Sequence, residues 1–291
     1  MTWIAWRQHR AELSAAALGL ALLAAIFVPF GFSMRAAFSR HGLNGCLLAG
    51  LSTQRCALAE DAFIGQFRSL TGMVGWFNFL PFILGALIGA PLVAREIERG
   101  THRLAWTQSV SRTRWIITQI AVAGAGVAAA AYGFTLLMSW WLAPSNQLNG
   151  LFNNDVFDFH GIAAIGYALF AFGLAALLGA AFRRILPAIA LTLPVYAAAR
   201  LVIQDAVRPH FIAPLTRTVS SDSQGSSRFL NDWIISQSVP PAHARGPSIV
   251  TEIYQPASRF WAFQGIETAL FTLAAAAFLA ITIWLVRRWT C

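Results

Sequence analysis

Long apolar blocks separated by short polar segments dominate the pattern along this 291-residue chain. A helix needs about 20 apolar residues to cross the roughly 30 Å hydrocarbon core of a bilayer. Six blocks are long enough, so we expect an all-α polytopic membrane protein that forms one transmembrane domain over residues 1–291. The expected spans cover residues 13–32, 73–93, 115–142, 161–181, 185–207 and 261–286.

The composition supports a membrane protein and excludes several mechanisms. Hydrophobic residues make up 57% of the chain and charged residues 11%, whereas about 25% of the residues in a soluble domain are charged. The Lys+Arg total of 21 consists entirely of arginine. Without lysine the chain has no Schiff-base lysine and no P-loop, whose motif ends in Gly-Lys-Ser/Thr. If the protein uses ATP, another chain must bind it.

The distribution of arginine predicts the orientation of the spans. Six spans put both termini on one side, and arginine is enriched in cytoplasmic loops. We expect both termini on the cytoplasmic side of the membrane, because the segments on that side then hold Arg7, Arg10, Arg95, Arg99, Arg103, Arg112, Arg114, Arg183, Arg184, Arg287 and Arg288. The opposite loop at residues 143–160 has no arginine and carries Asp155 and Asp158. This rule explains the net charge of +9, and no contiguous basic face indicates nucleic-acid binding.

The first twelve residues combine tryptophans with basic side chains ahead of the first span. Trp3 and Trp6 lie close to Arg7 and Arg10, and tryptophan favours the headgroup region of a bilayer. This pattern predicts a short interfacial helix over residues 1–12. The alternative is a frayed polar lead into the first span.

Residues 94–114, between the second and third spans, form the most distinctive polar segment. Alternating Arg and Glu predict that the second span continues as a helix into water until Gly100, a natural stop. Thr101 is a natural N-cap for a short coupling helix that contains Leu104 and Trp106. This coupling loop is either a handle for a soluble partner or a charged loop that merely obeys the topology rule.

The coupling loop also resembles that of a known family. Its segment Arg95-Glu-Ile-Glu-Arg-Gly-Thr101, followed by Trp106-Thr-Gln-Ser-Val-Ser-Arg-Thr-Arg114, is similar to the Glu-x-x-x-Gly-Thr loop of ATP-binding-cassette (ABC) type-two permeases. The opening Trp3-Ile-Ala-Trp-Arg-Gln-His-Arg10 resembles the six-span permeases common in actinobacteria. The similarity in span layout covers essentially the whole chain.

The resemblance implies an export permease of a bacterial plasma membrane that takes its energy from another protein. The expected partners are two copies of a separately encoded ATPase, which would bind ATP and Mg²⁺, a second copy of this permease, and membrane lipid. The chain itself would hold no cofactor. Closure of the ATPases would rock the spans and move an amphipathic or hydrophobic substrate outward (a drug, antibiotic, peptide or lipid). The expected ATPase contacts are Trp6, Arg7, Arg95, Glu96, Glu98, Arg99, Gly100, Thr101, Leu104 and Trp106.

Two opposite charges lie inside the expected spans. Arg200 and Glu267 are each six or seven residues from the outer end of a span, and so roughly 10 Å deep. A lone charge at the centre of a membrane helix costs about 2.5–3.5 kcal/mol on insertion scales. We therefore expect the two side chains to pair or to share an intramembrane polar network. Alternatively, Arg200 extends to the interface, or Glu267 is protonated or exposed to water.

A candidate substrate path follows from the second and fifth spans, where related exporters line theirs. Aromatic and polar side chains repeat there at helical spacing, although an aromatic stripe in a membrane helix also serves lipid contact or packing. The residues of this candidate path are Trp76, Asn78, Phe79 and Ile83 on the second span and Thr192 and Tyr196 on the fifth.

The second span also contains the motif Gly-x-x-x-Gly. Gly85 and Gly89 would let two membrane helices approach closely. Such runs also arise by chance in a chain rich in alanine and glycine, so the motif predicts either a helix contact or nothing.

Two segments expected on the outer side carry further signals. Cys46 and Cys56 either form a disulfide on that oxidising face or remain two thiols. The external loop at residues 208–259 has the pattern of a flexible polar link, a short amphipathic element at 229–235 and a break.

Other functional classes have weaker support in the sequence. None of the six histidines lies in His-Glu-x-x-His or pairs with cysteine at zinc spacing, so we expect no catalytic and no metal site. Glu267 leaves an ion-coupled secondary transporter open, although no internal repeat is visible. A membrane-embedded enzyme or an assembly factor is the remaining alternative.

Overall fold

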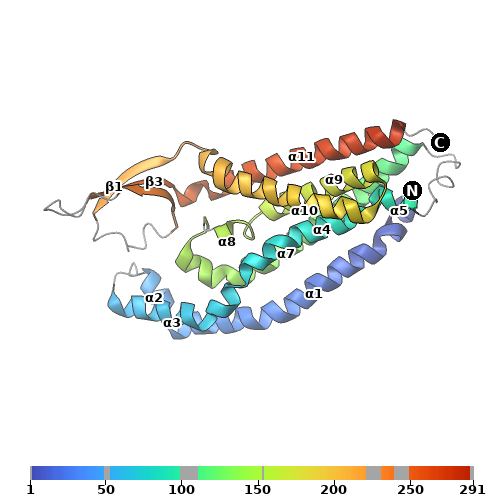
Figure 1. Ribbon diagram of the computed structural model, residues 1–291. Helices are drawn as coiled ribbons and strands as arrows, with labels where there is room; N and C mark the ends of the chain where they lie inside the picture. The colour runs from blue at the N-terminus through green and yellow to red at the C-terminus, as the bar shows by residue number, and fades with distance from the viewer. Residues whose placement is uncertain are drawn as a thin grey trace.

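Helices dominate the computed structural model, which describes residues 2–48, 53–98, 111–152, 154–220, 231–238 and 249–288. Most of the helices run along one long axis (Figure 1). They are α1 (Thr2–Arg40), α2 (Leu43–Leu48), α3 (Gln54–Thr71), η1 (Val74–Phe79), α4 (Leu80–Gly89), α5 (Pro91–Glu98), α7 (Arg112–Asn149), α8 (Asn154–Phe157), α9 (Ala163–Phe182), α10 (Ile185–Leu201), η2 (Val202–Val207), η3 (Arg208–His210), η6 (Ala257–Arg259) and α11 (Phe260–Arg288).

Six stretches of these helices are long and apolar enough to cross a membrane, which confirms the predicted class. The helices extend past the expected spans, because polar residues at their ends continue the same backbone. Thus α7 runs over Arg112–Asn149, whereas the apolar pattern predicted only residues 115–142.

The separate interfacial helix expected over residues 1–12 is not found. Instead α1 runs without a break from Thr2 to Arg40. Residues 7–13 contain no glycine or proline that would end a helix. The basic lead and the first span therefore form one helix.

The core of the bundle forms around α9, with α4, α10 and α11 packed against it. A Cβ atom at Gly85 would overlap with the carbonyl of Ala168, and one at Gly89 with the carbonyl of Phe172. The Gly-x-x-x-Gly motif is thus a contact between α4 and α9 within one chain. By contrast, α1 packs against α7 at the outside of the bundle (Figure 1).

The segment expected as the first outer loop is largely helical. There α1 continues to Arg40 and is followed by α2 and α3. Cys46 and Cys56 form a disulfide that joins α2 to α3. Met34 and Phe38 of α1 pack with Phe63 of α3 in a small core of their own.

Residues 208–259, expected as an external loop, contain a sheet that the sequence pattern did not predict. Strands β1 (Leu215–Ser220), β2 (Trp233–Ser238) and β3 (Ile249–Gln255) form an antiparallel sheet in the order β1-β3-β2. Arg217 of β1 lies opposite Glu252 of β3, and the register between β2 and β3 shifts between Ile234 and Ser236. Many of the strand residues are β-branched, which suits a sheet.

The two ends of the bundle hold different structural elements. α1 begins and α11 ends at one end, which we call the terminal end, and α5 and the turn between α9 and α10 lie there too (Figure 1). The sheet, α2 and α3 lie at the other end, which we call the sheet end (Figure 1). Both termini thus share one end, as an even number of spans requires.

Candidate functional site

A network of charged side chains is buried in the apolar bundle toward the sheet end. Its five members come from five places in the chain: α9, α10, η3, α11 and the linker between α8 and α9. Each is less than 10% exposed, so the network has almost no access to solvent. We call this set the buried ion network; it consists of Asp158, Tyr167, Arg200, Arg208 and Glu267.

Arg208 bridges the two carboxylates of the network. Its Nε donates to Oε2 of Glu267 at 2.8 Å, and its Nη2 donates to Oε1 of the same carboxylate at 2.8 Å. Nη2 also donates to Oδ1 of Asp158 at 2.9 Å. The contact with Glu267 is bidentate, the geometry in which an arginine binds a carboxylate most strongly.

Arg200 approaches the same two carboxylates from α10. Its Nη2 donates to Oδ2 of Asp158 at 2.6 Å, and its Nη1 lies 3.6 Å from Oε1 of Glu267. Its Nη2 also donates to Oδ1 of Asn78 in η1 at 3.4 Å. The structure therefore brings Arg200 and Glu267 into one polar network, and Glu267 is neither exposed nor unpaired.

Tyr167 of α9 ties the network to the central helix. Its hydroxyl donates to Oε1 of Glu267 at 2.6 Å and lies 3.2 Å from Oδ1 of Asp158. The guanidinium of Arg200 lies 3.5 Å from the centre of the Tyr167 ring. The guanidinium of Arg208 lies 4.1 Å from the ring centre of Phe157. The aromatic faces thus stabilise both cations where water does not reach.

The two arginines and two carboxylates balance in charge. Burying an isolated charge is costly, and a buried pair is tolerated only where good geometry offsets the loss of water. Asp158, which lies between two spans, shows this balance. Burial alone would raise its pKa, but Arg200 and Arg208 outweigh that effect and hold the pKa of Asp158 below its usual value.

A glutamine of α11 holds the linker that carries Asp158. The side chain of Gln264 is fully buried; its Nε2 donates to the carbonyl of Phe157 at 2.7 Å. Its Oε1 accepts from the backbone N–H groups of Ile162 and Ala163 at 3.0 and 2.8 Å. Gly161 in the same linker has a φ of 99°, a backbone conformation that is strained for any residue other than glycine. Gln264 is therefore a positioning residue that fixes the backbone around Asp158.

A π-helical turn brings Arg208 to the network. In an α-helix, eight residues turn about 800°, so Arg208 would lie about 80° away from the face of Arg200. However, η2 is a π-helix over Val202–Val207. The wider π turn rotates the chain less per residue and returns Arg208 toward the face of Arg200.

Aromatic side chains cover the network toward the sheet. Phe152 stacks on Trp233 of β2 at 5.7 Å between ring centres, and Trp233 also contacts Phe263 edge-on. Phe260 packs against both Phe152 and Phe157. These rings fasten the sheet to the bundle and exclude water from the charges behind them.

The expected ATPase contacts that the structure describes lie at the terminal end. Arg95 of α5 forms an ion pair with Glu12 of α1. Oε1 of Glu98 accepts from the backbone N–H of Ile185 at the start of α10, at 2.9 Å. Arg7 is exposed, with its guanidinium 5.4 Å from the ring centre of Trp3. Glu96 belongs to α5 as well. Outside the described residues or side chains lie Trp6, Arg99, Gly100, Thr101, Leu104 and Trp106.

The residues of the candidate substrate path occupy different environments. Trp76 is 74% exposed and Phe79 and Ile83 are also exposed, whereas Thr192 and Tyr196 are buried inside the bundle. Tyr196 packs against Phe82 and Phe170. Trp76, Phe79 and Ile83 thus face outward and do not form one lining with Thr192 and Tyr196. Only Asn78 of the second-span stripe reaches the fifth-span helix, through its hydrogen bond with Arg200.

Three members of the buried ion network were not predicted. The sequence pattern places Asp158 in an outer loop and Arg208 just past the end of the expected fifth span. It gives no feature that distinguishes Tyr167 from another tyrosine in a membrane helix. The flanking Phe157 and Phe159 could have identified Asp158, because a single carboxylate between aromatic residues is unusual in a loop exposed to water.

The fold and this site define a polytopic α-helical membrane protein whose described interior holds fixed, paired charges. Residues 17–208, about two thirds of the chain, match the family described as ABC-2 membrane transporter related. The chain therefore belongs to that family and is an ABC-2 type permease, which implies an ABC ATPase as a partner in general. A search among curated proteins finds no match.

Proposed function

We propose that this chain is the permease subunit of an ABC exporter that moves an amphipathic or hydrophobic substrate out of the cell. The family match over residues 17–208 carries the proposal. The complex would contain two copies of the permease and two copies of a separate ATPase, which binds ATP and Mg²⁺. The six apolar helices support the membrane half of this assignment.

The ATPase is proposed to dock at the terminal end. Two contacts there connect α5 to its neighbours: Arg95 pairs with Glu12 of α1, and Glu98 accepts from the backbone of Ile185 in α10. A push on the segment that follows α5 would therefore reach both helices. The arginines concentrated at this end favour its placement in the cytoplasm.

The buried ion network supports a rigid moving part. It joins α9, α10, α11 and the linker before α9, so these elements would move together. α1 packs on α7 outside this unit. ATP-driven displacement of one group of helices against the other would alternate the access of the substrate to the two sides.

The same network argues against a proton-coupled carrier. Such a carrier needs a buried carboxylate that gains and loses a proton during transport. Asp158 and Glu267 each accept hydrogen bonds from arginine in the described structure. This arrangement favours fixed salt bridges that stabilise the bundle.

The test is ATP-dependent uptake into inverted vesicles that contain the permease and its partner ABC ATPase. The proposal expects uptake and stimulated ATP hydrolysis, and Glu98→Ala should reduce both several-fold because α5 loses its contact with α10. Glu60→Ala, in α3 at the sheet end, is the matched control and should leave both unchanged. Uptake that follows a proton gradient without ATP would contradict the proposal and identify an ion-coupled transporter.

A further inference from the structure

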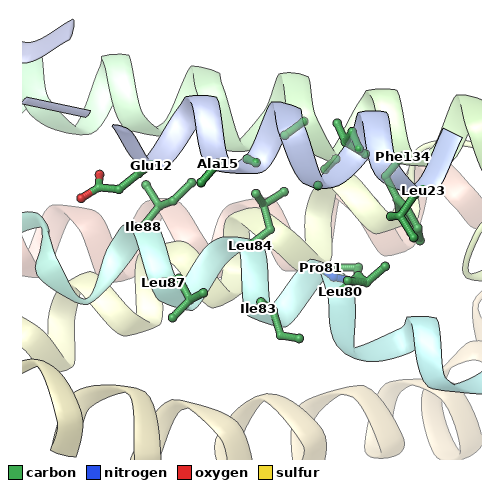
Figure 2. A pocket seen from close by; sticks show the side chains of 15 residues that line it. Glu12, Ala15, Leu23, Leu80, Pro81, Ile83, Leu84, Leu87, Ile88 and Phe134 are labelled. Carbon is green, nitrogen blue, oxygen red and sulfur yellow. The ribbon is translucent and has the colours of Figure 1, made fainter. Parts of the chain in front are cut away.

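An apolar cavity of about 450 Å³ lies between α1, α4 and α7. A cavity of about 150 Å³ already binds benzene, and ligand pockets usually measure about 300–1,000 Å³. Figure 2 shows Glu12 at one end of this cavity and Leu23 and Phe134 toward the other. Apart from Glu12, the residues that line the cavity are apolar residues and one glycine.

Small residues of α1 create this space. Ala15, Ala16 and Gly19 line the cavity, and no atom lies within 4 Å of the position that a Cβ of Gly19 would take. At the rim, Ile83 and Leu87 of α4 are 43% and 54% exposed. The cavity is therefore open at the side of the bundle, at the level of the apolar spans, where an amphiphile dissolved in the bilayer reaches it.

Glu12 is the one charged side chain among the residues that line the cavity. Its Oε1 accepts from Arg95, and its Oε2 lies 2.7 Å from Nδ1 of His9. Nε2 of His9 in turn lies 2.9 Å from Oε1 of Gln119. A carboxylate has about four acceptor sites, so Glu12 can accept from further donors. The Arg95 side chain is 34% exposed and can return to water.

We propose that this cavity binds the apolar body of an organic cation, whose positive charge competes with Arg95 for Glu12. This inference rests on the proposed export function and names its substrate class and entry site. An apolar cavity that ends in a carboxylate complements a hydrophobic cation and repels an anion of the same shape. Displacement of Arg95 would release α5 from α1, and α5 leads into the segment expected to contact the ATPase.

The experiment measures binding of tetraphenylphosphonium and tetraphenylborate, two ions of similar size and shape but opposite charge, to the permease in lipid nanodiscs. Empty nanodiscs give the background from the bilayer. The wild type should bind tetraphenylphosphonium saturably and bind tetraphenylborate at least tenfold more weakly. Glu12→Gln should weaken binding of the cation about tenfold, whereas Arg95→Gln should tighten it several-fold because the competing charge is gone.

Gly19→Leu places a bulky side chain in the open space beside Gly19 and should abolish saturable binding of the cation. Gly65→Leu is the matched control, because Gly65 also lies in a helix, with open space around its Cβ position, and does not line the cavity. The thermal unfolding of each variant shows that it is folded. Equal binding of both ions, unchanged binding in Gly19→Leu, or weaker binding in Arg95→Gln would overturn the site.

Because this assay contains neither ATP nor ATPase, its failure is distinct from failure of the proposed function. ATP-driven transport by a permease that binds no tetraphenylphosphonium would overturn the cation site and leave the export function standing. Saturable binding that depends on Glu12 and Gly19, without any ATP-driven transport, would support the site and contradict the export function.

Discussion

Two polar clusters in the helical bundle differ in how completely they are shielded from solvent. In the buried ion network, Arg200 and Arg208 neutralise Asp158 and Glu267, and aromatic rings cover the group. The terminal-end cluster consists of His9, Glu12, Arg95 and Gln119, and there the Arg95 side chain is 34% exposed beside an open cavity.

This difference in solvent exposure indicates which charged side chains can exchange their hydrogen-bond partners. Removing one partner of a fully desolvated ion pair strongly destabilises the folded protein, because the other charge is left buried alone. A partly exposed pair contributes little, because each charge can be solvated by water. We therefore expect the buried ion network to hold helices together and the terminal-end cluster to respond to ligands and partners.

The largest effect is expected from breaking the buried ion network. Asp158→Ala leaves Arg200 and Arg208 without one of their acceptors and should lower the free energy of unfolding by about 3–5 kcal/mol. Unfolding of the purified protein in detergent, followed by temperature or denaturant, measures this change. The double variant Asp158→Ala/Arg200→Leu should cost less than the sum of the two single variants; strict additivity would show that the two charges are not coupled.

A smaller loss is expected when the support of the network is removed. Gln264→Leu leaves three backbone groups of the α8–α9 linker without their partner and should cost about 2–3 kcal/mol. Thr268→Val is the control, because Thr268 donates only to the carbonyl of Gln264 on its own helix. Equal stability of the two variants would contradict the positioning role of Gln264.

The pH dependence of stability should reveal the closed cluster. Burial alone would raise the pKa of Asp158, but its two arginines lower the pKa in the folded protein, whereas an unfolded aspartate titrates near about 3.9. Below that pH the unfolded chain takes up the proton first, so stability falls as the pH falls through about 4. Above that pH the contribution is complete, and Asp158→Asn should flatten the acid limb of a plot of melting temperature against pH. An unchanged acid limb would assign the loss to other carboxylates.

The smallest effect is expected at the terminal end. Glu12→Gln keeps an acceptor for Arg95 and His9 and should change the free energy of unfolding by less than about 1 kcal/mol. The same unfolding assay measures it beside Asp158→Asn, the equivalent change in the closed cluster. A loss as large as that of Asp158→Asn would remove the distinction between the two clusters.

The spans and part of the buried ion network could be predicted from the sequence, because apolar runs and interrupting charges are local signals. Arg200 and Glu267 stand out for this reason. Asp158 does not, because the linker that carries it folds back into the bundle only through its contacts with Gln264 on α11. Arg208 depends on the π turn before it, which no sequence pattern indicated.

The three-stranded sheet could not be predicted for a related reason. Its strands are six or seven residues long and pair across long connections, so β3 lies between two strands that both precede it in the chain. Residues 221–230, which contain most of the expected flexible link, lie outside the described residues. Periodicity within the loop therefore could not indicate the pairing.

The most direct test of the proposed ATPase docking is photocrosslinking from the two ends of the bundle to the partner ATPase. A photoreactive residue at Arg184, in the turn between α9 and α10, should capture the ATPase in the native membrane. The same residue at Ile234 of β2 should not. Crosslinks from Ile234, or none from the terminal end in a complex that hydrolyses ATP, would contradict docking of the ATPase at the end that holds both termini.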